Sequence, residues 1–186
     1  MATNILETLG TQIVLLDTAS FTNTESESLV RAGATTGLMP LESTIADAAA
    51  VESATVDLGS TFATRFRVGA ALEFSSAPTA GEAVYLYGGF APTTGAFGGG
   101  LTAGASGAYA GTSASTVGES VKQLDLIGVF VCTDDGAPTV QIANNCGEFT
   151  AGNRYMKVVL RNEAGQSIAA NGGNHIVIDP IITQSQ

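Results

Sequence analysis

Charged residues are scarce in this sequence, and basic residues are the scarcest. Only 13% of its 186 residues are charged, against about 25% in an average globular protein. The 7 Lys and Arg against 17 Asp and Glu give a formal net charge of −10. Nucleic acids and anionic membrane surfaces attract proteins through Lys and Arg, so we expect neither as a partner. The low charge density favours a protein that buries much of its surface in an assembly.

The residues that build catalytic and metal sites are also few. His175 is the single histidine and could act as a base, but the sequence has no Gly-x-Ser-x-Gly nucleophile motif. Cys132 and Cys146 lack the close spacing of zinc ligands, so we expect two buried free thiols. Asp134 and Asp135 could ligate calcium, but acids before a glycine are more typical of a turn. We therefore predict no catalytic residue, no metal and no cofactor, and a protein that is not an enzyme.

Long apolar runs and an export signal are lacking as well. No apolar run is long enough to span a membrane. Residues 1–7 have neither a basic start nor an apolar stretch, so we expect synthesis in the cytosol without a cleaved export peptide. The sequence has no Trp, 4 Tyr and 8 Phe. This weakens, without excluding, a sugar-binding hypothesis, because sugar-binding sites are usually built from aromatic side chains.

Alternation of apolar and polar residues, which is typical of half-buried strands, is the main pattern that is present. Between residues 62 and 74 the apolar side chains fall on one face, while Arg65 and Arg67 fall on the other. Between residues 154 and 162 the same pattern predicts that Lys157 and Arg161 point to solvent. The expected strands are 12–17, 62–74, 82–90, 124–132, 139–143, 154–162 and 175–178, the last of them stopped by Pro180.

One further expectation concerns the position of a strand in its sheet, and two concern other elements. Residues 124–132 are almost all apolar, which predicts a central strand covered on both sides. Residues 40–56 are the best helix candidate, and at most one or two short helices are expected. The segment 83–118 has no charged side chain and ten glycines. We therefore expect residues 91–118 to be a long, neutral, flexible insertion between two strands.

The expected fold class is all-β, an antiparallel two-sheet jelly-roll-like sandwich with an N-terminal arm and a long Gly-rich insertion loop. A closed barrel is the alternative. Residues 1–60 are expected to form an acidic N-terminal arm and the first strands. Residues 61–186 are expected to form the β-sandwich domain with the insertion at 91–118. The N-terminal part carries eight acids and one base, Arg31, so it could dock on a basic surface or simply aid solubility.

One stretch, Phe149 to Ser167, resembles a late strand and turn of small β-sandwich virion proteins of tailed bacteriophages. Its Arg154-Tyr155, Val-rich strand and Asn162-x-x-Gly165 carry the resemblance, and the strand–turn–strand segment 66–89 is similar to the middle of those proteins. The similarity covers residues 60–180. It implies a jelly-roll virion component present in many copies.

The resemblance implies a capsid decoration or cement protein on the outside of a phage head, assembled in the host cytoplasm. The major capsid protein and a second or third copy of the chain would be its partners. Alternatives are a tail- or fibre-associated receptor-binding protein and a carbohydrate-binding β-sandwich module. We expect the insertion and the N-terminal segment to contact partners. The expected contact residues are Phe97, Leu101, Tyr109, Arg65 and Arg67.

Overall fold

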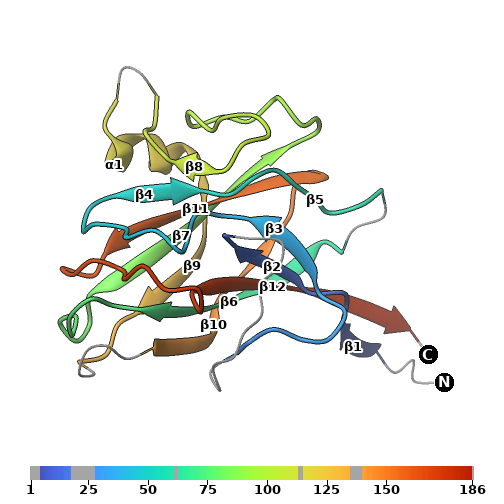
Figure 1. Cartoon of the computed structure of the whole chain (residues 1–186). Coiled ribbons are helices and arrows are strands. Elements are labelled where there is room, and N and C mark those ends of the chain that lie inside the picture. Colours follow the sequence, from blue (N-terminus) through green and yellow to red (C-terminus); the bar gives the residue numbers. More distant parts are fainter. Residues whose placement is uncertain (1–4, 18–27, 61–62, 113–114, 135–139, 186) are drawn as a thin grey trace.

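The computed structural model describes residues 5–17, 28–60, 63–112, 115–134 and 140–185. These residues form two β-sheets packed face to face (Figure 1). The elements are β1 (Ile5–Leu9), β2 (Ile13–Leu16), β3 (Thr35–Leu38), β4 (Ala50–Glu52), β5 (Val56–Asp57), β6 (Arg65–Glu73), β7 (Ala83–Ala91), β8 (Gly107–Ala108), α1 (Val117–Ser120), the 3-10 helix η1 (Val121–Gln123), β9 (Asp125–Val131), β10 (Val140–Thr150), β11 (Tyr155–Glu163) and β12 (His175–Ser185). Sheet one has the strand order β10-β6-β12-β2-β3, with β1 also paired to β12. Sheet two has the order β8-β4-β11-β7-β9, with β5 also paired to β11.

Eight of the strands are nested in a regular way. Taken in chain order, β2 pairs with β12, β4 with β11, β6 with β10 and β7 with β9, all antiparallel. The first strand therefore pairs with the last, the second with the next to last, and so on inward. That nesting, folded into two sheets, is the jelly-roll arrangement. The predicted all-β sandwich is confirmed, and strand pairs such as β2–β12 join residues 1–60 to residues 61–186.

The core between the sheets follows from the alternation along the strands. Phe66, Val68 and Leu72 of β6 are buried and contribute to one cluster with residues of sheet two such as Leu86 and Met156. At about 25 cal/mol per Å² of apolar surface removed from water, this cluster is the main source of stability.

The last strand is longer than the sequence predicted. It was expected to end at Pro180, but β12 continues to Ser185 and pairs with β1 beyond that point. Proline removes one donor from a ladder. Here the carbonyl of Pro180 still accepts the Gly10 N–H at 2.8 Å, and Arg31 Nη2 donates to the Gly10 carbonyl at 2.9 Å. The arginine thus supplies the donor that the proline lacks.

Two further expectations were wrong. Residues 124–132 form β9, which lies at the edge of sheet two, with Leu126 and Val131 exposed. Its apolar run arises because Ile127 and Phe130 face the core while the strand also lies against β10. Residues 40–56 form no helix. They contain β4 and the start of β5, because Val51 and Val56 complete the core. Two short helical segments, α1 and η1, are present elsewhere.

The edges of the two sheets meet along β9 and β10 at a pair of glycines. A Cβ atom added to Gly147 of β10 would lie 2.6 Å from the Ile127 carbonyl oxygen and 3.0 Å from Gly128 Cα of β9. The pairing of β10 with β6 also shifts register between Ala143 and Gly147. The missing side chain therefore lets the two backbones approach and closes this side of the sandwich.

Replacing Gly147 by Ala should destabilise the fold by about 1–3 kcal/mol, because the methyl group has no room unless β9 and β10 separate. Urea unfolding would measure the loss. Gly152→Ala is the matched control, since no heavy atom lies within 4 Å of its added Cβ. Equal stability of the two variants would contradict the close approach.

Candidate interaction surfaces

The insertion is packed onto the outer face of sheet two. Leu101 and Tyr109 are buried there against Ala50 and Val159, in a second apolar cluster outside the main core. The Tyr109 hydroxyl donates a hydrogen bond to the carbonyl of Gly99. Sheet two is therefore covered on both faces, and the insertion is held by the chain's own sheet.

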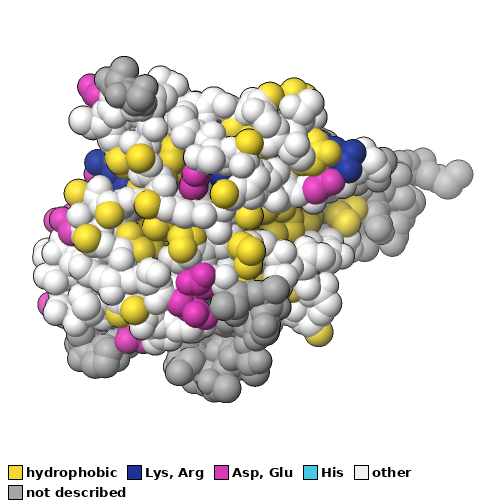
Figure 2. Space-filling view, turned by 45° about the horizontal axis from the view of Figure 1, so that its top comes forward, with side chains coloured by type: hydrophobic (Ala, Val, Ile, Leu, Met, Phe, Trp, Pro, Cys, Tyr) yellow, Lys and Arg dark blue, Asp and Glu magenta, His cyan; other side chains and the backbone are white. Residues whose placement is uncertain are grey.

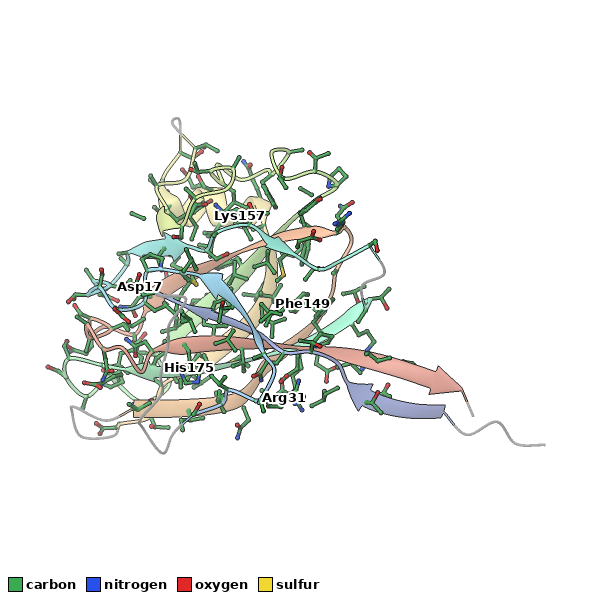
Figure 3. The ribbon with its side chains drawn as sticks, turned by 45° about the vertical axis from the view of Figure 1, so that its right-hand side comes forward. Asp17, Arg31, Phe149, Lys157 and His175 are labelled. Atoms are coloured by element: carbon green, nitrogen blue, oxygen red, sulfur yellow. The ribbon has the colours of Figure 1, made fainter. Side chains whose placement is uncertain are left out.

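A buried ion pair anchors this insertion. Lys157 of β11 is 0% exposed, and its Nζ lies 3.1 Å from Glu52 Oε2 of β4. The same Nζ donates to the carbonyls of Thr102 and, at 2.7 Å, Ala105. The Thr102 N–H points back to the Glu52 carboxylate at 3.2 Å. Figure 3 shows Lys157 beneath the insertion.

The burial of Lys157 corrects the expectation that it points to solvent. Alternation does place it on the outer face of β11, but the insertion covers that face. Burial lowers the pKa of Lys157, and the hydrogen bond and charge of Glu52 oppose this shift. Arg161, expected on the same face, has a side chain that is 20% exposed and pairs with Glu163. The insertion is therefore an ordered cover, not a loose connection, over its described residues.

The outer face of sheet one is covered by the segment 28–34. Asp179 of β12, which is buried, accepts hydrogen bonds from Arg31 Nη2 at 2.5 Å and from Gln12 Nε2 at 3.1 Å. The Arg31 N–H donates to Gln12 Oε1 at 2.7 Å. Leu29 and Val30 pack against the apolar cluster of this face. The segment is thus fixed to sheet one by charge as well as by apolar contact.

His175 is part of the same fastening. The Leu29 N–H donates to its Nε2 at 3.1 Å, and Nδ1 lies 2.6 Å from the Gly173 carbonyl oxygen. Because the first partner is a donor and the second an acceptor, the ring is neutral with its proton on Nδ1. His175 is 1% exposed, and its ring binds the backbone of residues 29 and 173, so its role is structural.

A two-stranded ribbon extends past the end of the sandwich. β1 pairs over its five residues with Ile181–Ser185 of β12, and the ribbon continues sheet one beyond the body of the sandwich (Figures 1 and 3). Arg65 at the start of β6 ties the ribbon to the body, with Nη1 2.7 Å from Glu7 Oε1 and Nη2 3.0 Å from Glu148 Oε2. Ile5 and Ser185, the first and last residues that the structure describes, are therefore paired in one projecting element.

A hollow of about 410 Å³ lies at the base of the ribbon. Its walls are both apolar and polar, and Asp57 is part of them. Asp57 forms an ion pair there, with Arg154 Nε 2.7 Å from Asp57 Oδ1 and Arg154 Nη2 2.7 Å from Asp57 Oδ2. Ile182, on the ribbon, is 39% exposed beside it. The lining includes Ile13, Leu58, Ala63, Phe66, Pro180 and Ile182.

The five expected contact residues fall into two groups on opposite sides of the sandwich. Leu101 and Tyr109 are buried under the insertion, and Phe97 packs beside them. Arg65 and Arg67 lie on the outer side of sheet one, where Arg67 Nη2 is 3.4 Å from Asp179 Oδ2. They do not form one surface, and their contact with a partner stays a prediction. The ribbon's Ile182 and the hollow were missed, because they depend on β12 running past Pro180.

The remaining candidate groups can be placed briefly. Cys132 and Cys146 are both free, but only Cys132 is fully buried, whereas Cys146 is half-buried. Burial raises the pKa of each thiol to about 11. Among the described residues no group of three His, Cys, Asp or Glu is arranged to hold a metal ion. Asp135, of the calcium alternative, lies outside the described residues. No helix of the described chain is long and apolar enough to cross a membrane.

Replacing Lys157 by Met should destabilise the protein by about 3–5 kcal/mol, because the Glu52 carboxylate would stay buried without its cation. Two carbonyls of the insertion would also lose their donor. Urea unfolding would give the loss, and limited proteolysis between residues 98 and 106 should become faster. Arg154→Met is the control, since its ion pair is exposed and contributes little. Equal effects of the two variants would refute the anchor.

The protein should lose stability as pH falls from 7 toward 5. Burial lowers the pKa of His175, and its hydrogen bond to Gly173 only partly opposes this. An unfolded histidine titrates at about 6.5, so below that pH the unfolded state binds a proton that the folded state resists. The loss begins near about pH 6.5 and continues down through the lower folded-state pKa.

Unfolding free energies measured across this range would show the slope. His175→Gln keeps an acceptor for the Leu29 N–H and removes the titration, so its slope should be flatter. A slope unchanged by the substitution would assign the pH dependence to carboxylates.

Comparison with known proteins adds no relative, since no protein-family model, no curated protein and no solved structure matches the chain.

Proposed function

We propose that this chain is a structural virion protein of a tailed bacteriophage that binds the outside of the capsid lattice and reinforces it. The observation that carries the proposal is the projecting ribbon with the hollow at its base. Ile182 presents an apolar side chain there, beside a space large enough for several side chains of another protein. Such a protruding apolar element favours docking on a neighbour.

The low stability expected of an isolated ribbon favours a role in an assembly. A two-stranded ribbon is marginally stable in water unless further strands or a packed face support it. One ion pair, between Arg65 of β6 and Glu7 of β1, joins the ribbon to the sandwich. A capsid protein bound against the ribbon and hollow would provide additional packing for the ribbon. Binding would then stabilise the ribbon as well as the capsid.

The charge distribution suits a basic docking surface. Arg31, Arg65, Arg67, Arg154, Lys157 and Arg161 all form ion pairs within the chain. Most basic side chains are therefore paired within the chain. Acidic residues outnumber basic ones by 17 to 7, so the surplus negative charge is available to a basic partner. Figure 2 shows a face on which neutral and apolar side chains predominate and charged ones are few. Complementary charge steers encounter and sets register.

Repetition explains how modest contacts would reinforce a shell. A stable interface buries about 1,600 Å², and a single ribbon and hollow offer part of this. On a lattice the same contact is repeated by many copies. Where contacts are linked, the first one raises the effective concentration for the next contact, so modest contacts add up. The role needs a rigid body between contacts, which the doubly covered sandwich supplies.

Ile182→Lys should lower occupancy on capsids about tenfold, since a charge replaces an apolar side chain in the hollow and costs at least 1.4 kcal/mol. Occupancy would be measured by adding the purified protein to capsids that lack it and quantifying the bound fraction. Val131→Lys is the control, because Val131 is 58% exposed on β9, outside the ribbon. Equal occupancy of the two variants would overturn the docking surface. Binding of the unaltered protein confined to tails would favour the receptor-binding alternative.

A further inference from the structure

The outer edge of β1 is an unpaired strand edge. β1 bonds to β12 along one side, and no described strand pairs with its other side. Gly10 and Pro180 form a hydrogen-bonded pair, and such pairs alternate along an antiparallel ladder. Thr8 therefore directs its backbone groups toward β12, whereas Glu7 and Leu9 direct theirs outward. A row of unused donors and acceptors lines the ribbon.

Among the described strands, the other sheet edges are shorter or partly covered. β3, the end strand of sheet one, has four residues, and its Leu38 carbonyl accepts the Ala54 N–H at 2.7 Å. β9 and β10 lie against each other at the glycine pair, and β8 is only two residues long. Proteins blunt exposed edges with proline, lysine or bulges. The five residues Ile5–Leu9 contain no proline and no lysine. Leu9 is 42% exposed beside this edge.

Charge does not prevent two such edges from meeting, although the chain is acidic overall. Glu7 is the only ionisable residue of β1, and Arg65 lies 2.7 Å from it. The ribbon therefore brings little net charge to a second ribbon. Repulsion between the acidic bodies would fall with distance, because salt screens exposed charges beyond about 8 Å.

We propose that two copies of the chain pair through β1, edge to edge and antiparallel about a two-fold axis. A two-fold axis brings a surface patch against itself, so it presents one β1 edge to the other with opposite strand direction. The order β12-β1-β1-β12 then forms a four-stranded sheet across both molecules. This exceeds the three strands that a free-standing sheet needs, whereas each ribbon alone has two.

A second copy is the occupant that the edge favours most. It offers a strand of the same length, equally free of proline and lysine, and its Glu7 is already compensated. The proposed function explains what the pairing would be for, because a dimer with two hollows would bind a lattice at two points. The pairing itself does not depend on that function, and it leaves the hollow open to a capsid protein.

Mass measurement in solution tests the pairing. The unaltered chain should run at twice its 18.7 kDa mass in light scattering after size exclusion. Leu9→Lys should run at the single-chain mass, with dimer affinity lowered about tenfold or more. Leu126→Lys is the matched control, since Leu126 is 54% exposed on the edge strand β9, and it should stay dimeric. A single-chain mass for the unaltered protein, or a dimer for Leu9→Lys, would overturn the proposal.

Amide hydrogen exchange identifies the edge itself. In the dimer the Glu7 and Leu9 N–H groups should be protected as well as that of Thr8, and in Leu9→Lys the Glu7 N–H should exchange at least tenfold faster. A dimer whose Glu7 N–H exchanges freely would place the interface elsewhere. Protection that appears only on capsids would assign the edge to a capsid strand. If Ile182→Lys binds capsids less well but stays dimeric, the capsid contact and the dimer contact are different surfaces, and the two proposals can fail independently.

Discussion

The backbone pairing of β12 is the interaction on which the rest of the structure depends. This one strand pairs with β6 on one side and with β2 and then β1 on the other. Its inward side chains Ile176 and Ile178 lie in the core, while His175 and Asp179 fasten the covering segment outside. The first and last strands of the jelly roll close against each other here. Loss of this pairing would therefore release the ribbon, the cover and the centre of sheet one together.

Pro180 marks the point where β12 passes from the body into the ribbon. Proline within a central strand leaves an acceptor without its donor, and an unmade bond in such a place costs about 1–3 kcal/mol. Arg31 meets this need by donating to Gly10, and the same guanidinium binds Asp179. One side chain thus couples the cover on sheet one to the continuity of the ladder. That coupling explains why a strand expected to stop runs on for five more residues.

Local sequence patterns predicted the strands of the two sheets well, but they did not predict which side chains other segments cover. Alternation in 62–74 and 154–162 identified β6 and β11, because side-chain period depends only on neighbouring residues. Alternation could not predict that Lys157 is buried, since this depends on an insertion some fifty residues earlier in the chain. Ile182 was missed for a similar reason. Proline disfavours the interior of a sheet because it lacks an N–H donor, and the donor that replaces it here comes from Arg31, far away in the sequence. The apolar run of β9 likewise reports packing against β10, which local sequence does not encode.

Three of the few basic residues have identifiable structural roles. Arg65 joins β1 to β10, Lys157 holds the insertion, and Arg31 serves the proline. Each spans distant parts of the chain, so basic residues act as internal fasteners while acids in excess face outward. A protein arranged in this way keeps an acidic body and a nearly neutral ribbon. Electrostatic repulsion between two copies would then be weakest at the ribbon, which favours self-association at that edge.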